Sequence, residues 1–150
     1  MDSKQAADFL VGLPESEFVL HGSPHWLTML EPRQAHCGSG VPANNLNAIY
    51  ASIVVECALF KALVRGENDN WGWRFYDEDD GDQTAFVVQG EGLRLEHGYI
   101  YVLPCERFTR VEGTLWWVAF EPVTPTLRIR VEPNILGHFS GVFFESGVSV

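Results

Sequence analysis

Hydrophobic residues change their spacing about halfway along the chain, which indicates helices first and strands later. Residues 53–65 are apolar almost all round, because Glu56, Lys61 and Arg65 are the charged positions in this segment. A helix with so narrow a polar face is typical of one that is buried against a sheet. We therefore expect one main buried helix here, and Ser52 is the residue that can cap its N-terminus.

The N-terminus carries a shorter helical pattern. Ser3 can cap a helix over residues 4–11, in which Phe9 and Leu10 form the packing face and a glycine follows the last turn. Residues 34–47 contain glycines, a proline and asparagines, so we expect a long loop there. Loops of this length inside a compact domain often carry function.

Short runs of β-branched and aromatic residues between turn signals predict strands. We expect extended segments at residues 17–21, 26–30, 48–50, 72–76, 85–89, 98–103, 115–120 and 126–131, and a further strand within 134–150. One main helix followed by many antiparallel strands gives an α+β fold. No internal repeat or linker divides the sequence, so residues 1–150 are expected to form a single domain.

The charge balance limits the partners that this chain can bind. It has 20 acidic residues against 10 basic ones, which gives a formal net charge of -10. Because nucleic-acid affinity comes largely from Lys and Arg that displace counterions, non-specific binding to DNA or RNA is not expected. A small anionic ligand is compatible with this charge, since a few backbone N–H groups or one Arg can hold a pyrophosphate.

The spacing of Cys and His residues argues against a disulfide framework or a metal site. Cys37, Cys57 and Cys105 match no zinc-ligand pattern, and His21 and His25 lie across a proline-containing turn rather than on one helix face. We therefore expect no metal and a reducing compartment, the cytoplasm. No window approaches 18 apolar residues, and the N-terminus lacks the apolar stretch of a signal peptide, so no membrane association is expected.

An acidic run at residues 77–82 invites comparison with a calcium-binding loop. Gly81 falls where a ligand is required, and no bidentate Glu closes a twelve-residue loop. We therefore interpret this run as a solvated hairpin turn.

Two short segments have the chemistry to hold a nicotinamide nucleotide. Residues 20–24 are Leu-His-Gly-Ser-Pro at the predicted end of a strand, and residues 49–52 are Ile-Tyr-Ala-Ser at the entrance to the main helix. Gly22 allows a backbone N–H and C=O to approach a flat carboxamide, while His21 offers a hydrogen bond to a ribose hydroxyl. Tyr50 can stack on the ring. The alternative interpretation of the first segment is a turn with a satisfied histidine.

These segments resemble motifs of the ADP-ribosyltransferase family, of the diphtheria-toxin and poly(ADP-ribose) polymerase types. Residues 21–23 are similar to its His-Gly-Ser/Thr, residues 48–52 to its Gly-Ile-Tyr-Phe-Ala, and residues 57–60, Cys-Ala-Leu-Phe, to its Ser-Ala-Asn-Tyr. The resemblance implies split antiparallel β-sheets, one main buried helix, a short N-terminal helix and a pocket for NAD. The residues implied at that pocket are His21 as ribose ligand, Gly22 as backbone clamp, Tyr50 and Phe60 as ring walls, and Ser23, Ser52, Cys57 and Trp116 as further contacts, with His21 and Tyr50 acting in catalysis.

The catalytic glutamate of that family has no direct counterpart in this chain. The family motif Glu-Tyr-Ile-Val-Tyr-Asp is most similar to residues 116–121, Trp-Trp-Val-Ala-Phe-Glu, so the glutamate position falls on Trp116. A neutral indole does not supply the negative charge that stabilises a developing cation. Glu112 and Glu121 are near in sequence and are candidates to replace the missing carboxylate. Polymer-forming activity is not expected.

Three functions stay open at this point. The first is a mono-ADP-ribosyltransferase that cleaves the nicotinamide–ribose bond of NAD and transfers ADP-ribose to an unknown acceptor. The second is a catalytically inactive module that binds NAD or another nucleotide in the same pocket and signals through a partner protein. The third is an interaction protein in which Trp71, Trp73, Trp116 or Trp117 contributes to an exposed interface.

Overall fold

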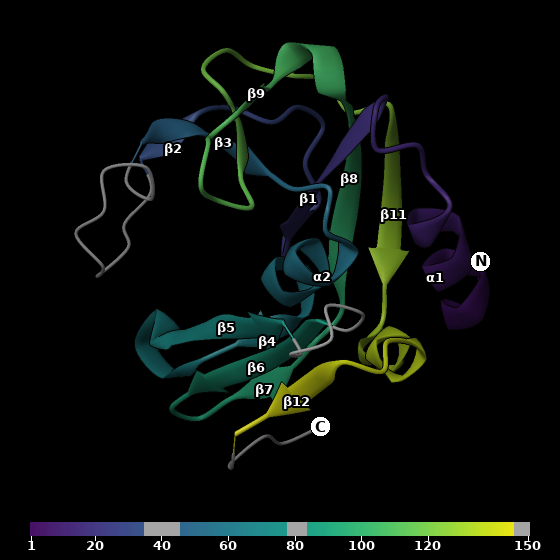
Figure 1. Ribbon diagram of the computed structural model, residues 1–150, viewed down its shortest axis with the longest axis vertical. Coiled ribbons are helices and arrows are strands. Elements are labelled where there is room, and N and C mark those ends of the chain that lie inside the picture. Colours follow the sequence, from purple (N-terminus) through teal and green to yellow (C-terminus); the bar gives the residue numbers. More distant parts are fainter. Residues whose placement is uncertain (35–45, 78–83, 146–150) are drawn as a thin grey trace.

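The computed structural model describes residues 1–34, 46–77 and 84–145 of the chain (Figure 1). Its helices are α1 (Ser3–Val11) and α2 (Val55–Leu63), with short 3-10 turns at Glu67–Asp69, Cys105–Arg107 and Pro133–His138. Its strands are β1 (Phe18–Ser23), β2 (Arg33–Gln34), β3 (Asn47–Ala51), β4 (Val64–Arg65), β5 (Trp71–Asp77), β6 (Thr84–Gly90), β7 (Arg94–Leu95), β8 (Gly98–Pro104), β9 (Thr109–Arg110), β10 (Trp117–Ala119), β11 (Leu127–Val131) and β12 (Val142–Phe144).

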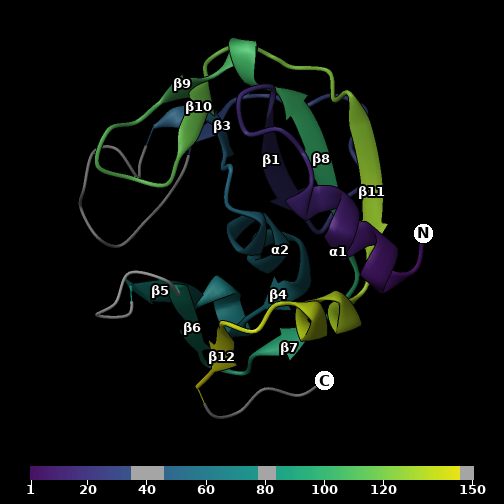
Figure 2. The same cartoon turned by 45° about the vertical axis from the view of Figure 1, so that its right-hand side comes forward.

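Within the described residues the strands form four small sheets. Their orders are β1-β8-β11, β2-β3-β10-β9, β12-β6-β5 and β4-β7. Every pair is antiparallel except β12 with β6, which is parallel. The two views of the ribbon show α2 between the β1-β8-β11 sheet and the sheet that contains β5 and β6 (Figures 1 and 2). The expectation of an α+β fold with mostly antiparallel sheets is confirmed.

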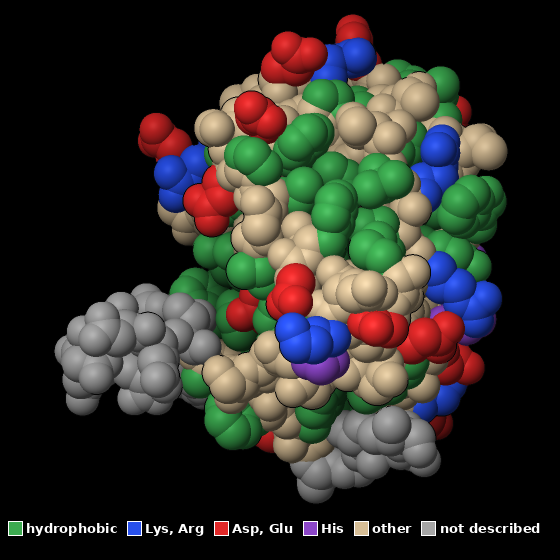
Figure 3. All heavy atoms as spheres, turned by 90° about the vertical axis from the view of Figure 1, so that its right-hand side faces the viewer, with side chains coloured by type: hydrophobic (Ala, Val, Ile, Leu, Met, Phe, Trp, Pro, Cys, Tyr) green, Lys and Arg blue, Asp and Glu red, His purple; other side chains and the backbone are tan. Residues whose placement is uncertain are grey.

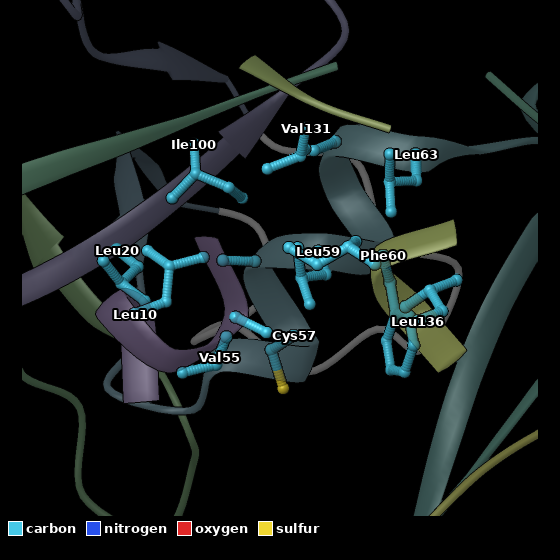
Figure 4. Close-up of a cluster of buried hydrophobic side chains, with 14 of the residues drawn as sticks. Leu10, Leu20, Val55, Cys57, Leu59, Phe60, Leu63, Ile100, Val131 and Leu136 are labelled. Atoms are coloured by element: carbon cyan, nitrogen blue, oxygen red, sulfur yellow. The ribbon is translucent and has the colours of Figure 1, made fainter. Parts of the chain in front are cut away.

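Helix α2 forms the centre of the main hydrophobic core. Seven of its nine residues are buried, and they join apolar side chains from α1, β1, β8, β11 and the β6 strand in one cluster (Figure 4). The helix is shorter than the predicted 53–65, because the chain passes directly into β4 after Leu63. The Ser52 hydroxyl does not cap the helix. It accepts a hydrogen bond from the Val54 N–H at 3.0 Å and so holds the turn that leads into α2.

Two glycines let the α2 backbone approach the β1-β8-β11 sheet. A Cβ atom placed on Gly22 of β1 would lie 1.8 Å from the carbonyl oxygen of Ala58. A Cβ atom on Gly98 of β8 would lie 2.0 Å from the carbonyl oxygen of Ala62. Ala58 and Ala62 stand one helical turn apart, so one small-residue stripe of α2 faces both strands.

A second core lies on the opposite face of the same sheet. Val19 and Tyr101 are fully buried there against Ile49 and Ala51 of β3 and Ala119 of β10. A single antiparallel bridge between Leu20 and Ser52 joins β1 to the end of β3. This bridge holds the two sequence segments that carry the candidate site side by side.

Helix α1 covers the outer side of the fold. Its N-cap is Asp2 rather than the predicted Ser3, because the Asp2 carboxylate accepts from the Gln5 N–H while the Gln5 side chain accepts from the Asp2 N–H. Phe9 was expected to pack with Leu10, but Phe9 is exposed and Leu10 is buried with two alanines. Figure 3 views this side and shows hydrophobic side chains gathered over the middle of the face.

Several strands differ from the expected ones. Residues 26–30 form no strand, and Leu30 alone among them makes a bridge, to Val123. Strand β10 is limited to Trp117–Ala119, and the predicted C-terminal strand exists as β12 but pairs in parallel. Apart from Asp77 in β5, the acidic run lies outside the described residues, as do most of the predicted 34–47 loop and Cys37.

The close approach of α2 predicts a large stability loss for Gly98→Ala. The added methyl group meets a backbone carbonyl that cannot rotate away, so α2 must move from the sheet at a cost of about 1–3 kcal/mol or more. The measurement is the free energy of unfolding in urea. Gly137→Ala is the matched control, because a Cβ there meets no atom within 4 Å. Equal stability of the two variants would contradict this packing.

Candidate functional site

A pocket of about 990 Å³ opens where β1, β3, β5 and α2 meet. Its size lies at the upper end of the roughly 300–1,000 Å³ that small-molecule sites occupy. Seven of the eight residues expected at the site contribute to its lining: His21, Gly22, Ser23, Tyr50, Ser52, Cys57 and Trp116. The fold thus brings together segments that are far apart in the sequence, and Phe60 is the exception.

His21 is held as a neutral imidazole with a defined tautomer. Its Nδ1 lies 2.6 Å from the Tyr50 carbonyl oxygen, and since a carbonyl can only accept, Nδ1 carries the proton. Desolvation lowers the pKa of His21, the nearby positive charge of Lys61 lowers it further, and the hydrogen bond to Tyr50 opposes this shift. The remaining ring nitrogen, Nε2, is therefore a hydrogen-bond acceptor. It suits a ligand hydroxyl group.

Gly22 presents backbone polar groups at the free edge of β1. The N–H and C=O of Leu20 both bond to Ser52 at 2.8 Å, on the side of β1 that faces away from β8. Backbone groups alternate sides along an antiparallel strand, so the N–H and C=O of Gly22, two residues later, point to the same edge. The chain turns into α2 after Ser52 and leaves this edge to the pocket. One donor and one acceptor on one residue match a carboxamide.

Tyr50 and Trp116 form an aromatic wall of the pocket. Their rings meet edge to face with centroids 5.9 Å apart, and the Tyr50 hydroxyl accepts from the Leu46 N–H at 2.8 Å. The ring of Trp116 also packs against that of Trp73 of β5, with the two ring centroids 5.9 Å apart. Trp116 lies just before β10 rather than inside it, where the predicted strand over 115–120 places it, and it lines the pocket from there.

Phe60 does not line the pocket. Its side chain is fully buried in the main core (Figure 4). There it packs against Trp73 and Phe86. The ring surface expected from Phe60 is provided instead by Trp73 and Trp71, which line the pocket from β5. Trp73, whose ring centroid lies 5.5 Å from that of Phe60, thus stands between Phe60 and the pocket.

Three smaller predicted residues line the pocket but use their side chains locally. The Ser23 hydroxyl accepts from the His25 N–H at 3.1 Å, and the Ser52 hydroxyl accepts from Val54. Burial raises the pKa of the Cys57 thiol to about 12, so this residue stays protonated. Their positions shape the pocket, and none of them supplies a charged group to it.

The loop after β1 is fixed over one rim of the pocket. The buried Tyr101 hydroxyl donates to the His25 carbonyl at 2.5 Å and accepts from the Leu27 N–H at 2.6 Å. Arg128 donates from Nε to the Leu27 carbonyl at 2.8 Å and also to the Thr28 carbonyl. Two side chains from the sheet thus hold residues 25–28, which form no strand.

The pocket differs in charge from the chain as a whole. Within the part of the chain that the structure describes, the positively charged residues of its lining are Arg33, Lys61 and Arg74, and the carboxylates are Glu31 and Asp69. Glu112 and Glu121, the candidates to replace the missing glutamate, are exposed and are not part of the lining. The carboxylates available to a ligand are therefore different from those that sequence spacing indicated.

Sequence reasoning missed Lys61, Trp71 and Trp73 as pocket residues, although each had a signal. Trp71 and Trp73 stand two residues apart on a strand, which places both rings on one face. Lys61 follows Cys57 by four residues on α2, which places both on one side of a helix. The ammonium nitrogen of Lys61 lies 5.9 Å from the Trp71 ring centroid and 5.5 Å from that of Trp73.

Comparisons with protein-family models, with curated proteins and with solved structures find no match to this chain. The described part of the chain contains no group of three or more His, Cys, Asp or Glu side chains that could hold a metal ion. Among the described helices, none is both long and apolar enough to cross a membrane. The site must therefore be interpreted from its own geometry.

The neutral state of His21 predicts a specific pH dependence of stability. The pKa of His21 is lowered below 6.5 in the folded chain. As the pH falls below 6.5, His21 is therefore protonated in the unfolded chain but stays neutral in the folded chain. His21 therefore makes the free energy of unfolding decrease as the pH is lowered from 6.5 to the folded pKa of this residue. Above pH 6.5 it adds no pH dependence. His21→Gln should reduce this slope in urea unfolding measured from pH 8 to 5. Exposed His138→Gln is the control, and equal slopes in wild type and His21→Gln would refute the assignment.

Proposed function

We propose that the pocket binds NAD and that the chain is a mono-ADP-ribosyltransferase-like protein with split antiparallel β-sheets of that family's type. The observation that carries the proposal is the pairing of a neutral His21 with the open strand edge at Gly22. Nicotinamide ribose carries a carboxamide beside a ring and hydroxyls on the sugar. The pocket offers a matching acceptor, a backbone donor and acceptor, and aromatic walls.

Each part of the dinucleotide has a counterpart in this arrangement. The carboxamide bonds to the N–H and C=O of Gly22, and a ribose hydroxyl donates to Nε2 of His21. The nicotinamide ring lies against Tyr50 or Trp73, whose faces and edges favour offset or edge contacts with another ring. A pocket of about 990 Å³ is large enough for a ligand of this size.

The proposed reaction breaks the bond between the ribose C1′ and the nicotinamide nitrogen. The bonding electrons leave with nicotinamide, which departs as a neutral molecule. A nucleophilic oxygen or nitrogen of the acceptor then bonds to C1′ and loses its proton to a base. Glu31 and Asp69 are the lining carboxylates that can take this proton, and His21 and Tyr50 orient the ribose for attack.

A second function is favoured by Trp116. Its indole occupies the pocket wall where the resemblance places the catalytic glutamate, and it is fixed there by edge contacts with Tyr50 and Trp73. Tyr50, Trp73 and Trp116, the described residues of this wall, carry no carboxylate to stabilise positive charge at C1′. The same pocket then binds NAD without turning it over, and the bound nucleotide regulates contact with a partner.

Binding of NAD is tested by its effect on thermal unfolding. At a NAD concentration 100 times Kd, binding adds about 2.7 kcal/mol to stability. This corresponds to a rise in Tm on the order of 5–10 °C for a domain of this size. His21→Ala should lose the shift, while the control His138→Ala, on the exposed turn before β12, should keep it. No shift in wild type at millimolar NAD would overturn the proposal.

Nicotinamide release then separates the two functions. A transferase releases nicotinamide from NAD in the presence of protein, and Glu31→Gln or Asp69→Asn should lower the rate at least 10-fold if that carboxylate acts as the base. A binding module shows the thermal shift without release at micromolar protein. Release that persists unchanged in His21→Ala would show a contaminating activity and refute the site.

A further inference from the structure

Lys61 is a pocket residue to which neither sequence motif nor the proposed NAD contacts give a role. It projects from α2 one turn after Cys57, beside Ala58, and all three line the pocket next to Gly22. Among the described residues, the lining holds three basic side chains and two carboxylates. Basic side chains therefore outnumber carboxylates in the described lining, although the chain as a whole carries 20 acidic and 10 basic residues.

The three basic residues are placed differently. Arg74 of β5 binds the Glu145 carboxylate and the Gln89 side chain, each at 2.6 Å, so its guanidinium is engaged across its own sheet. Arg33 lies on the two-residue strand β2 at the outer side of the β2-β3-β10-β9 sheet. Lys61 belongs to the central helix and lines the pocket together with His21 and Gly22.

Two observations fix the position of the Lys61 ammonium group. It lies over the indole rings of Trp71 and Trp73, whose negative faces attract a cation. Its charge also contributes to the lowered pKa of His21, so the two groups lie within electrostatic reach of each other. A ligand that contacts His21 can therefore place an anionic group beside Lys61.

We propose that Lys61 binds the 5′-phosphate of a nucleotide whose ribose is held by His21. This inference rests on the proposed function, which assigns contacts to the carboxamide, the ring and the ribose of the ligand but none to its phosphate. Gly22 meets a neutral amide and His21 a hydroxyl, so neither selects a charged group of the ligand, whereas an ammonium group in the same lining attracts an anionic one. A lysine ammonium group binds phosphate as a point charge with up to three hydrogen-bond donors. It can therefore bond to any of the phosphate oxygens.

The test compares two ligands that differ by one phosphate, nicotinamide riboside and nicotinamide mononucleotide, by isothermal titration calorimetry. Wild type should bind the mononucleotide at least 10-fold more tightly, since a charge-assisted hydrogen bond contributes on this scale. Lys61→Met keeps the apolar stem over the indoles and should reduce the ratio to near one. Lys61→Arg should retain most of it.

The matched control is Lys4→Met, since Lys4 is exposed on α1 and pairs with Asp8 away from the pocket. It should keep the wild-type ratio. The Tm of Lys61→Met without ligand shows whether the variant is folded, and Lys61→Arg reports on the charge if Met destabilises the helix. Equal affinity of wild type for the two ligands, or equal weakening of both by Lys61→Met, would overturn the phosphate assignment.

Adenosine monophosphate separates this inference from the proposed function. If it binds in a Lys61-dependent way while the nicotinamide ligands do not bind, Lys61 holds a phosphate but the site is not specific for NAD. If nicotinamide mononucleotide binds through His21 and is insensitive to Lys61, NAD binding stands and the phosphate lies elsewhere. Absence of binding by all three compounds at millimolar concentration would overturn both.

Discussion

The close contact between the α2 backbone and the β1-β8-β11 sheet is the constraint on which the site depends. Gly22 and Gly98 leave no room for a Cβ atom, because the carbonyl oxygens of Ala58 and Ala62 occupy that space. This distance sets α2 directly beside the free edge of β1, so Cys57, Ala58 and Lys61 become neighbours of His21 around one pocket. If larger side chains held α2 further from the sheet, the α2 residues would not lie beside the free edge of β1.

The same contact changes the meaning of a motif that was interpreted as a ligand site. The sequence indicates Gly22 as a backbone clamp for a carboxamide, and the structure shows that helix packing already requires glycine at this position. Both roles are compatible. The position that a side chain would occupy faces α2, while the N–H and C=O lie in the plane of the sheet and point outward from its free edge. A short motif such as His-Gly-Ser therefore carries information about packing as well as chemistry, and sequence alone does not separate them.

The main elements of the fold were predictable from periodicity, and the failures have physical causes. β2, β4, β7 and β9 have two residues each, too few to show a period, and the parallel pairing of β12 depends on where the chain returns. Phe60 was placed at the pocket by its spacing in a motif. Successive helix residues turn by about 100°, so Phe60 lies on the order of 160° away from Ala58 and faces the core. Trp73 reaches the pocket from a strand that no motif included.

The charges around the pocket favour a bound anion more than a cation-like transition state. Lys61 places an ammonium group near a neutral His21, and Trp116 stands where the resemblance places a carboxylate. Positive charge that develops on a ribose C1′ would be repelled by Lys61 and not compensated by the indole. Under the proposal, the same ammonium group would stabilise the phosphate of the bound nucleotide before any bond is broken. If the proposed transferase reaction takes place in this pocket, it therefore needs a carboxylate close to the ribose, and Glu31 and Asp69 are those that the described lining provides.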